Sequence, residues 1–316
     1  MTTPYTRKQR MLNAYRGIYS DRPPVAPEFW SYWPAKLLGV DMIEFEREVP
    51  FHLALKRTFD VFDCEGWGLV MPEIPNPAVS VESSDRRIDA ESLECRTVFH
   101  TPQGTLTAAT RYHVAEPSWP VEGPIKDPAR DLAAWECLAF DACEEELDGP
   151  RLTAAWRECG ESYLAEALLA VPFFDTYASA RDGGFEAALM DFFEPELRPI
   201  FERLRERYIE TTWRWVAALA AQTPLESYFI GCAWSCNSLL GPVLWREWDK
   251  PALRRIADEV HRHGKLLHLH FHGRVLETAA DLAELGIDCV CPFERPPGGD
   301  VEGLEGLRQV RRLLEE

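Results

Sequence analysis

The chain has 316 residues, of which 46% are hydrophobic, and its formal net charge is -18 at pH 7. The acidic excess argues against nucleic-acid binding, because no surplus of Lys and Arg is present to neutralise phosphates. No apolar run reaches the length of a membrane span and no basic-then-apolar leader starts the chain, so neither membrane insertion nor secretion is expected. The nine cysteines are an odd number without a small-domain framework, which favours reduced thiols and a cytoplasmic protein.

The first part of the chain alternates between helical and strand patterns. The pattern predicts a short basic helix over 6–17, a first strand over 25–30, helices over 34–39 and about 48–61, and a second strand over 66–71. Strands that alternate with helices indicate parallel pairing through right-handed crossovers. The sequence therefore predicts an α/β fold.

Residues 80–116 break this rhythm. Strand-like alternation over 86–89 and 93–100 is followed by the turn Thr101-Pro102-Gln103-Gly104-Thr105 and a returning strand over 106–114. This pattern predicts an antiparallel hairpin inserted into the α/β frame. A linker is expected over 120–125, and Asp127-Pro128 is expected to cap a helix that runs to about residue 137.

The second half returns to the alternating pattern. In chain order, we expect a third strand within 164–177, helices over 183–192 and 195–220, a fourth strand over 228–234, a loop over 235–242, a helix ending at 261–264, a fifth strand over 265–270, a sixth over 287–293, and a last helix over 301–315. Seventh and eighth strands are not visible in the sequence.

Three of the eight histidines alternate along the predicted fifth strand, at His268, His270 and His272. Alternate residues leave a strand on the same side, and imidazoles are costly to bury without partners. A metal ion is the favoured explanation, with His270 and His272 as ligands and His268 in the core. The alternative is a set of hydrogen-bonded core histidines.

Other candidate residues lie after the predicted strands. Glu294 is a candidate metal ligand or general base, with a solvated loop carboxylate as the alternative. Cys236 and Asn237, in the loop after the fourth strand, are candidate substrate contacts. Trp30 and Tyr32, together with Trp33, are candidates for an aromatic wall against substrate; packing under the hairpin is the alternative. Cys289 and Cys291 share one face of the sixth strand and are expected to be core thiols.

Short motifs are spread over the whole chain. They are Arg10-Met11-Leu12, Asp21-Arg22-Pro23-Pro24-Val25-Ala26-Pro27, Pro34-Ala35-Lys36-Leu37-Leu38-Gly39, Thr101-Pro102-Gln103-Gly104, Pro124-Ile125-Lys126, Phe174-Asp175-Thr176-Tyr177, His263-Gly264-Lys265, His270-Phe271-His272-Gly273, Gly286-Ile287-Asp288 and Gly299-Asp300. In this order they resemble the uroporphyrinogen decarboxylase superfamily, which includes corrinoid-dependent methyltransferases acting on coenzyme M.

The resemblance implies a TIM-type (β/α)8 barrel, a single domain over 1–316, with its site at the C-terminal ends of the strands. It also implies that Asp175 and Tyr177 face the pocket, where they are candidate catalytic residues. Because strands seven and eight are not visible, three arrangements stay open: an incomplete or open barrel, a barrel closed by a partner chain, or a shortened family member with impaired activity.

The two branches of the superfamily imply different sites. The decarboxylases have an arginine-rich loop after the first strand, which is absent from Trp30-Ser31-Tyr32-Trp33-Pro34-Ala35-Lys36 and disfavours an octa-acid substrate. The methyltransferases have His-x-Cys-Gly and a later cysteine that hold zinc. His270 and His272 match the His-x-Cys pair. Glu294 and Cys291 are candidates to complete the shell, and Cys232 and Cys236 are less favoured.

The resemblance therefore implies a zinc-dependent methyltransferase that moves a methyl group between a corrinoid and a small, thiol-type acceptor. Two alternatives stay open: a tetrapyrrole decarboxylase, and a non-catalytic protein that binds a corrinoid or another small ligand. A small-molecule substrate is the expected partner, a corrinoid protein is a candidate partner, and homo-oligomerisation is left open.

Overall fold

The structure is a computed structural model that describes residues 5–315. The chain forms two compact units: unit 1 comprises Met1–Ala167 and Gln222–Glu226, and unit 2 comprises Leu168–Ala221 and Ser227–Glu316. The organisation of residues 1–316 as one domain stays a prediction. No helix in the described range is both long and apolar enough to cross a membrane.

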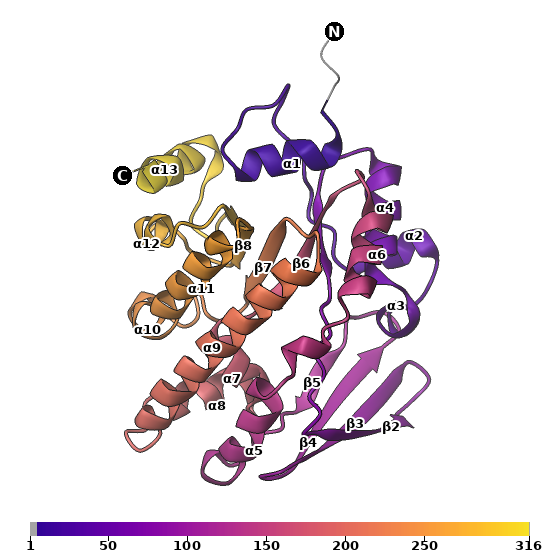
Figure 1. The fold of residues 1–316 in the computed structure, drawn as a ribbon, viewed down its shortest axis with the longest axis vertical. Helices are drawn as coiled ribbons and strands as arrows, with labels where there is room; N and C mark the ends of the chain where they lie inside the picture. Colours follow the sequence, from indigo (N-terminus) through magenta and orange to yellow (C-terminus); the bar gives the residue numbers. More distant parts are fainter. Residues whose placement is uncertain (1–4, 316) are drawn as a thin grey trace. The chain divides into compact units, whose positions relative to one another are not determined.

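Unit 1 combines N-terminal helices, two parallel strands and an antiparallel sheet (Figure 1). Its elements are α1 (Arg7–Tyr15), α2 (Tyr32–Leu38), α3 (Met42–Glu48), α4 (Phe51–Phe62), β1 (Trp67–Val70), β2 (Ser80–Arg87), β3 (Ser92–Thr101), β4 (Gly104–His113), β5 (Trp119–Glu122), α5 (Pro128–Phe140), the 3-10 turn η1 (Glu144–Glu146), α6 (Gly149–Cys159) and the start of β6 (Leu164–Ala170). β1 and β6 pair in parallel, from Trp67 opposite Leu164 to Val70 opposite Ala167.

One prediction for the N-terminal part of unit 1 is wrong, and one helix there was not predicted. Residues 25–30 form no strand, and the prolines at 23, 24 and 27 explain this because they donate no backbone hydrogen bond. The helix expected over 48–61 is present as α4, which begins three residues later, and α3 before it was not predicted. The two helices are separated at Pro50, whose ring disfavours helical geometry in the residue before it.

The predicted hairpin is the centre of a larger antiparallel sheet with the order β2-β3-β4-β5. β3 and β4 pair from Ser92 opposite His113 to Thr101 opposite Gly104, so the predicted turn is confirmed. The strand expected over 86–89 is the end of the longer β2, and the expected linker over 120–125 begins with strand β5. Asp127 caps α5 as predicted, because its side chain accepts a hydrogen bond from Ala129 N at 3.0 Å.

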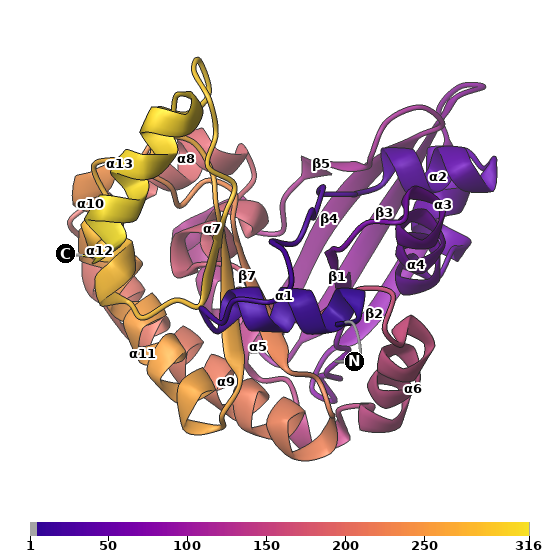
Figure 2. The same ribbon diagram turned by 90° about the horizontal axis from the view of Figure 1, so that it is seen from above.

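Unit 2 contains the remaining parallel strands and their helices. Its elements are the end of β6, α7 (Phe173–Ala180), α8 (Gly184–Asp191), α9 (Arg198–Gln222), β7 (Ser227–Cys232), α10 (Pro242–Trp248), α11 (Lys250–Arg262), β8 (Leu266–Phe271), α12 (Ala279–Glu284), β9 (Cys289–Cys291) and α13 (Gly303–Glu315). The strand order is β6-β7-β8-β9. Figure 2 shows α11, α12 and α13 as an outer layer beside these strands.

The expected third strand within 164–177 ends earlier than predicted. β6 ends at Ala170 and α7 begins at Phe173, so Asp175 and Tyr177 lie on a helix and not at a strand exit. An aromatic cluster anchors this helix in unit 2; its rings belong to Phe173, Phe174, Tyr177, Phe192, Phe201 and Trp248. All six side chains are almost fully buried.

The parallel strands number five across residues 5–315: β1, β6, β7, β8 and β9. The α/β class and the parallel sheet are as predicted. A complete eight-stranded barrel is not confirmed.

Candidate metal centre

The candidate centre is built on two neighbouring strands of unit 2. β8 is buried along its whole length, and it pairs in parallel with β9, with His268 opposite Cys289 and His270 opposite Cys291. Opposite residues of a parallel pair project from the same face of a sheet, and alternate residues of a strand share that face. The register therefore brings His268, His270 and Cys291 together.

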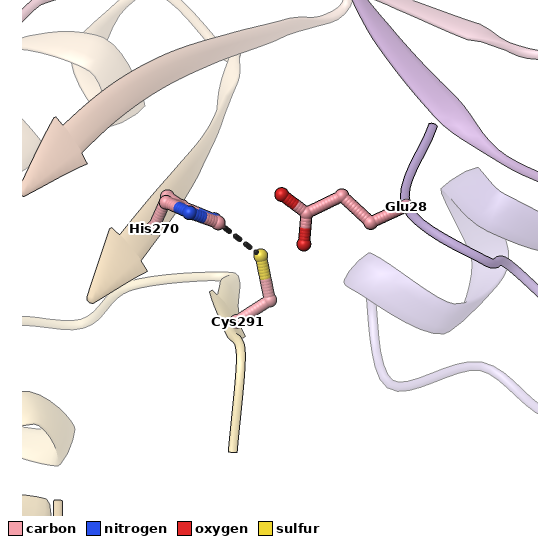
Figure 3. A group of neighbouring side chains, drawn as sticks. All are labelled: Glu28, His270 and Cys291. Atoms are coloured by element: carbon pink, nitrogen blue, oxygen red, sulfur yellow. Dashed lines mark hydrogen bonds between the residues drawn. The ribbon is translucent and has the colours of Figure 1, made fainter. Parts of the chain in front are cut away.

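The thiol of Cys291 lies against two imidazoles. Its Sγ is 2.9 Å from His268 Nε2 and 3.1 Å from His270 Nδ1. Figure 3 shows the contact between His270 and Cys291. Glu28, also drawn there, belongs to unit 1, whereas His268, His270 and Cys291 all belong to unit 2. One sulfur and two ring nitrogens are thus placed within hydrogen-bond distance.

The cluster continues towards solvent through His272 and Glu294. His270 Nε2 is 2.8 Å from His272 Nε2, and His272 Nδ1 is 3.4 Å from Glu294 Oε1. The second oxygen of Glu294 accepts a hydrogen bond from Gly273 N. A chain of polar contacts therefore runs from the half-buried Glu294 to the fully buried His268.

Burial controls the charge of the central imidazole. Burial, together with the neighbouring His272 and His268, lowers the pKa of His270 to about 3. The ring of Phe229, on β7, lies 5.1 Å from the His268 ring and 5.7 Å from the His270 ring. His270 is therefore neutral near pH 7, which is the form in which an imidazole nitrogen can bind a metal.

Asp175, a predicted catalytic residue, is fully buried on α7 and holds the loop after β7. Its carboxylate accepts hydrogen bonds from Ala233 N (2.8 Å), Trp234 N (3.0 Å) and Ser235 N (2.7 Å). Burial and the nearby Asp249 raise the pKa of Asp175 to about 8. These contacts give Asp175 a positioning role for the loop; its catalytic role stays a prediction.

Tyr177 is buried in the aromatic cluster of unit 2. Its hydroxyl donates to Asp191, at 2.5 Å, and Arg181 Nε lies 2.7 Å from the same carboxylate oxygen. This network joins α7 to the end of α8. Tyr177 thus lies on α7 within the aromatic cluster, whereas His270 and Cys291 lie on β8 and β9.

The predicted substrate contacts lie in different settings. Cys236 is buried, and its backbone carbonyl accepts from Leu240 N in the loop after β7; Asn237 next to it is half-buried. In unit 1, Trp30 is 39% exposed and stacks on Phe51. Tyr32 is 54% exposed and donates to Glu116. Contact of any of these four with substrate stays a prediction.

Two members of the cluster had a core position among their predictions. His268 was expected to be a packed imidazole, and Cys291 either a packed thiol or a residue that completes the metal shell; each lies within 3.1 Å of another member. The signal was present in the spacing: alternation on both strands puts these residues on one face once β8 and β9 are neighbours. What the sequence did not supply was the register that sets Cys291 opposite His270.

Comparison with known proteins finds a similarity in fold to a solved structure. No protein-family model and no curated protein matches the sequence. A solved structure of a methyltransferase from Methanosarcina mazei superposes with a TM-score of 0.57 at 14% identity, covering 90% of this chain and 75% of that chain. At this identity the likeness is one of fold, and it extends over nearly the whole chain.

Proposed function

We propose that this protein is a zinc-dependent methyltransferase that moves a methyl group between a corrinoid and a small thiol. The observation that carries the proposal is the contact of Cys291 Sγ, at the end of β9, with two imidazoles of β8. The likeness in fold to a methyltransferase supports the same reaction class. It does so by analogy, because one fold hosts many reactions.

The donor set suits zinc. Neutral imidazole and thiolate are the preferred ligands of this ion, which binds four groups in a tetrahedron. A tetrahedral zinc ion separates its sulfur and nitrogen ligands by roughly 3.5 Å. The distances of 2.9 and 3.1 Å from Cys291 Sγ to His268 and His270 are slightly shorter, so shifts of a few tenths of an ångström would admit the ion.

His270, through Nδ1, and Cys291 are the proposed pair of ligands, and His268, which contacts the same sulfur, is the first candidate for the next nitrogen. His272 contacts the other ring nitrogen of His270, so it would reach the same ion only after its ring turns. Glu294 would orient His272, because a carboxylate on the far nitrogen of a metal-bound imidazole fixes the ring and raises its basicity. When bound, zinc would hold an acceptor thiol as thiolate and so as a nucleophile at neutral pH. The burial of His270 excludes water from that side of the site.

Metal analysis tests the site directly. The purified chain, loaded with excess zinc and dialysed, should retain about one ion per chain. His270→Ala and Cys291→Ala should each reduce retention at least ten-fold, because removal of a ligand costs more than removal of its supporting partner. Comparison of His268→Ala with His272→Ala identifies the third ligand.

Matched controls keep the result interpretable. Cys289→Ala changes a thiol of the same strand, and His261→Ala removes an exposed imidazole that pairs with Asp288. Both controls should retain the ion. The proposed metal site is wrong if the wild-type chain stays metal-free in excess zinc, or if the Cys291→Ala variant retains as much zinc as the wild type.

Activity is tested separately with methylcobalamin and small thiols, by the change in corrinoid absorbance and the appearance of the methyl thioether. The zinc-loaded wild type should catalyse the transfer, and His270→Ala should not. A chain that binds zinc but transfers no methyl group to any of a series of small thiols is a non-catalytic binding protein, and the proposed reaction is then wrong.

A further inference from the structure

The two outer strands of the antiparallel sheet in unit 1 differ in how they are protected. β5, at one edge, has four residues, contains Pro120 and pairs with β4 through an irregular register near Ala109. Short length, proline and a bulge are the features that prevent an edge strand from pairing with another chain. β5 is therefore a blocked edge.

β2, at the other edge, has none of these features (Figure 1). Its eight residues are Ser80-Val81-Glu82-Ser83-Ser84-Asp85-Arg86-Arg87, without proline or lysine. All eight are exposed, and their pairing with β3 runs without a break from Ser80 opposite His100 to Arg87 opposite Leu93. A long, regular and exposed edge strand is a template for strand addition.

We infer that β2 pairs with β2 of a second copy of this chain, antiparallel and about a two-fold axis, so that the two antiparallel sheets become one. The sequence of β2 argues for a copy of itself as partner. Glu82 and Asp85 balance Arg86 and Arg87, so the strand is neutral although the chain carries a net charge of -18. Pairing of two β2 strands therefore adds no net local charge repulsion between the two acidic chains.

The geometry of antiparallel pairing restricts the register. Residues directly opposite each other have the same hydrogen-bonding role, and these roles alternate along a strand. When the two strands are identical, two residues that lie opposite each other must therefore both have even residue numbers or both have odd residue numbers. One residue consequently lies opposite its own copy at the two-fold axis.

Charge selects among the central registers. With Ser84 on the axis, Glu82 lies opposite Arg86 of the second copy, and the symmetry forms this pair twice. With Asp85 or Glu82 on the axis, two like charges lie opposite each other, which is unfavourable. With Ser83 on the axis, no opposite-charge pair forms. The register centred on Ser84 is the one that uses the charges of the strand.

The contacts within one chain are compatible with this pairing. The Glu82 side chain is 77% exposed beside His100, and the Arg86 side chain is 72% exposed, 2.9 Å from Glu94. These partners lie on β3, on the inner side of β2, and leave the outer side accessible. Pairing needs no rearrangement of the sheet.

Cysteine cross-linking tests the register in the full-length chain. In the inferred dimer the two copies of residue 84 are about 5 Å apart between Cβ atoms. Ser84→Cys should therefore give a disulfide-linked dimer under mild oxidation, or a dimer linked by a short bifunctional thiol reagent. Ser80→Cys is the matched control, because its two copies would be about 27 Å apart. The wild type reports any linkage through the native thiols.

Charge reversal tests the pairing itself. Sedimentation at protein concentrations up to about 1 mM should show dimers of the wild type. Glu82→Arg should weaken dimerisation about ten-fold, because it places like charges opposite each other twice. The double variant Glu82→Arg, Arg86→Glu should restore it, since the pair is re-formed with its charges exchanged.

Either of two outcomes overturns the inference. One is a wild type that is monomeric throughout this concentration range. The other is a dimer that neither cross-links through Ser84→Cys nor responds to the charge reversals, which places the interface elsewhere on the chain. Both substituted side chains are exposed, so loss of folding is not expected to confuse the test.

Discussion

At the scale of single residues, Asp175 is a buried acidic group held by backbone hydrogen bonds. Three backbone amides donate to its carboxylate, although the group is buried beside a second carboxylate, Asp249, which accepts from Phe174 N at 3.2 Å. Burial raises the pKa of Asp249 to about 6, as it raises that of Asp175 to about 8. The two groups together thus retain a proton near neutrality, which limits the cost of burying two adjacent charges.

This pair predicts how stability depends on pH. Because both folded-state pKa values lie above those of the unfolded chain, the folded protein binds protons more tightly, and stability falls as pH rises from about 4 to about 8. The loss is at most about 1.4 kcal/mol per pH unit for each group. Urea unfolding between pH 5 and pH 8.5 measures it.

Asp175→Asn provides the comparison for this pH dependence. Its unfolding free energy should be lower than that of the wild type and should change less with pH, because the amide does not titrate. Equal slopes for the two proteins would mean that Asp175 is ionised throughout the range.

At the scale of helices and strands, the sequence predicted those elements whose pattern is hydrophobic. β8 was expected over 265–270 and lies at Leu266–Phe271. It could be predicted because a fully buried strand has a short, largely apolar sequence. α9 was expected over 195–220 and lies at Arg198–Gln222, where apolar residues recur at helical spacing. The hairpin turn between β3 and β4 was predicted from Pro102 and Gly104, which are residues typical of turns.

The elements that were missed or predicted only in part have other determinants. Only the end of β2 was predicted, over 86–89. The strand is exposed on both faces, so it lacks an alternation of polar and apolar residues along its length, and its strand geometry comes from pairing with β3. The segment 25–30 has the apolar residues of a strand but lies in no sheet. For the candidate metal centre, the sequence singled out His270 and His272 and gave Glu294 and Cys291 as candidates to join them. The contact of His268 with Cys291 was not predicted, because it depends on a strand register that is not encoded locally.

The start of α5 provides a test at this scale. Asp131 accepts hydrogen bonds from Lys126 N (2.8 Å) and Asp127 N (2.9 Å), and the Arg130 guanidinium together with these amides lowers the pKa of this buried carboxyl to about 2. We expect Asp131→Asn to lower the unfolding free energy at pH 7 by about 1 to 3 kcal/mol. Because the folded-state pKa is depressed, the wild-type contribution is present above about pH 4 and disappears as pH falls towards 2.

Chemical unfolding of both proteins at pH 7 and pH 2.5 measures this difference. Asp141→Asn, at the other end of α5, is the matched control and should change stability little. A difference between wild type and Asp131→Asn that is as large at pH 2.5 as at pH 7 would show that the carboxylate charge is not what stabilises the start of the helix.

At the scale of the whole molecule, the net charge of -18 dominates. Ion pairs such as Lys56–Asp60 and Arg198–Glu202 join exposed side chains, and pairs of this kind contribute little. Repulsion among the surplus acidic groups destabilises the folded chain and is screened by salt. Raising NaCl from about 0.02 to about 0.3 M should therefore raise the melting temperature by a few degrees.

Calorimetry at pH 7 measures this shift, and the same titration near the isoelectric point of about 4.9 is its control. There the surplus charge is absent and the effect of salt should vanish. A melting temperature that falls with salt at pH 7 would mean that the ion pairs outweigh the repulsion.

The five residues Gln222–Glu226 belong to unit 1 although the chain has by then passed through much of unit 2. Glu226 supplies a carboxylate 2.7 Å from the nearly buried ammonium of Lys8 and accepts from Trp156 Nε1 at 2.9 Å. During synthesis, the ion pair between Lys8 and Glu226 therefore cannot form until Glu226 has left the ribosome, more than two hundred residues after Lys8. The N-terminal unit can form its sheets early, but it closes its last buried ion pair only after most of the chain has been made.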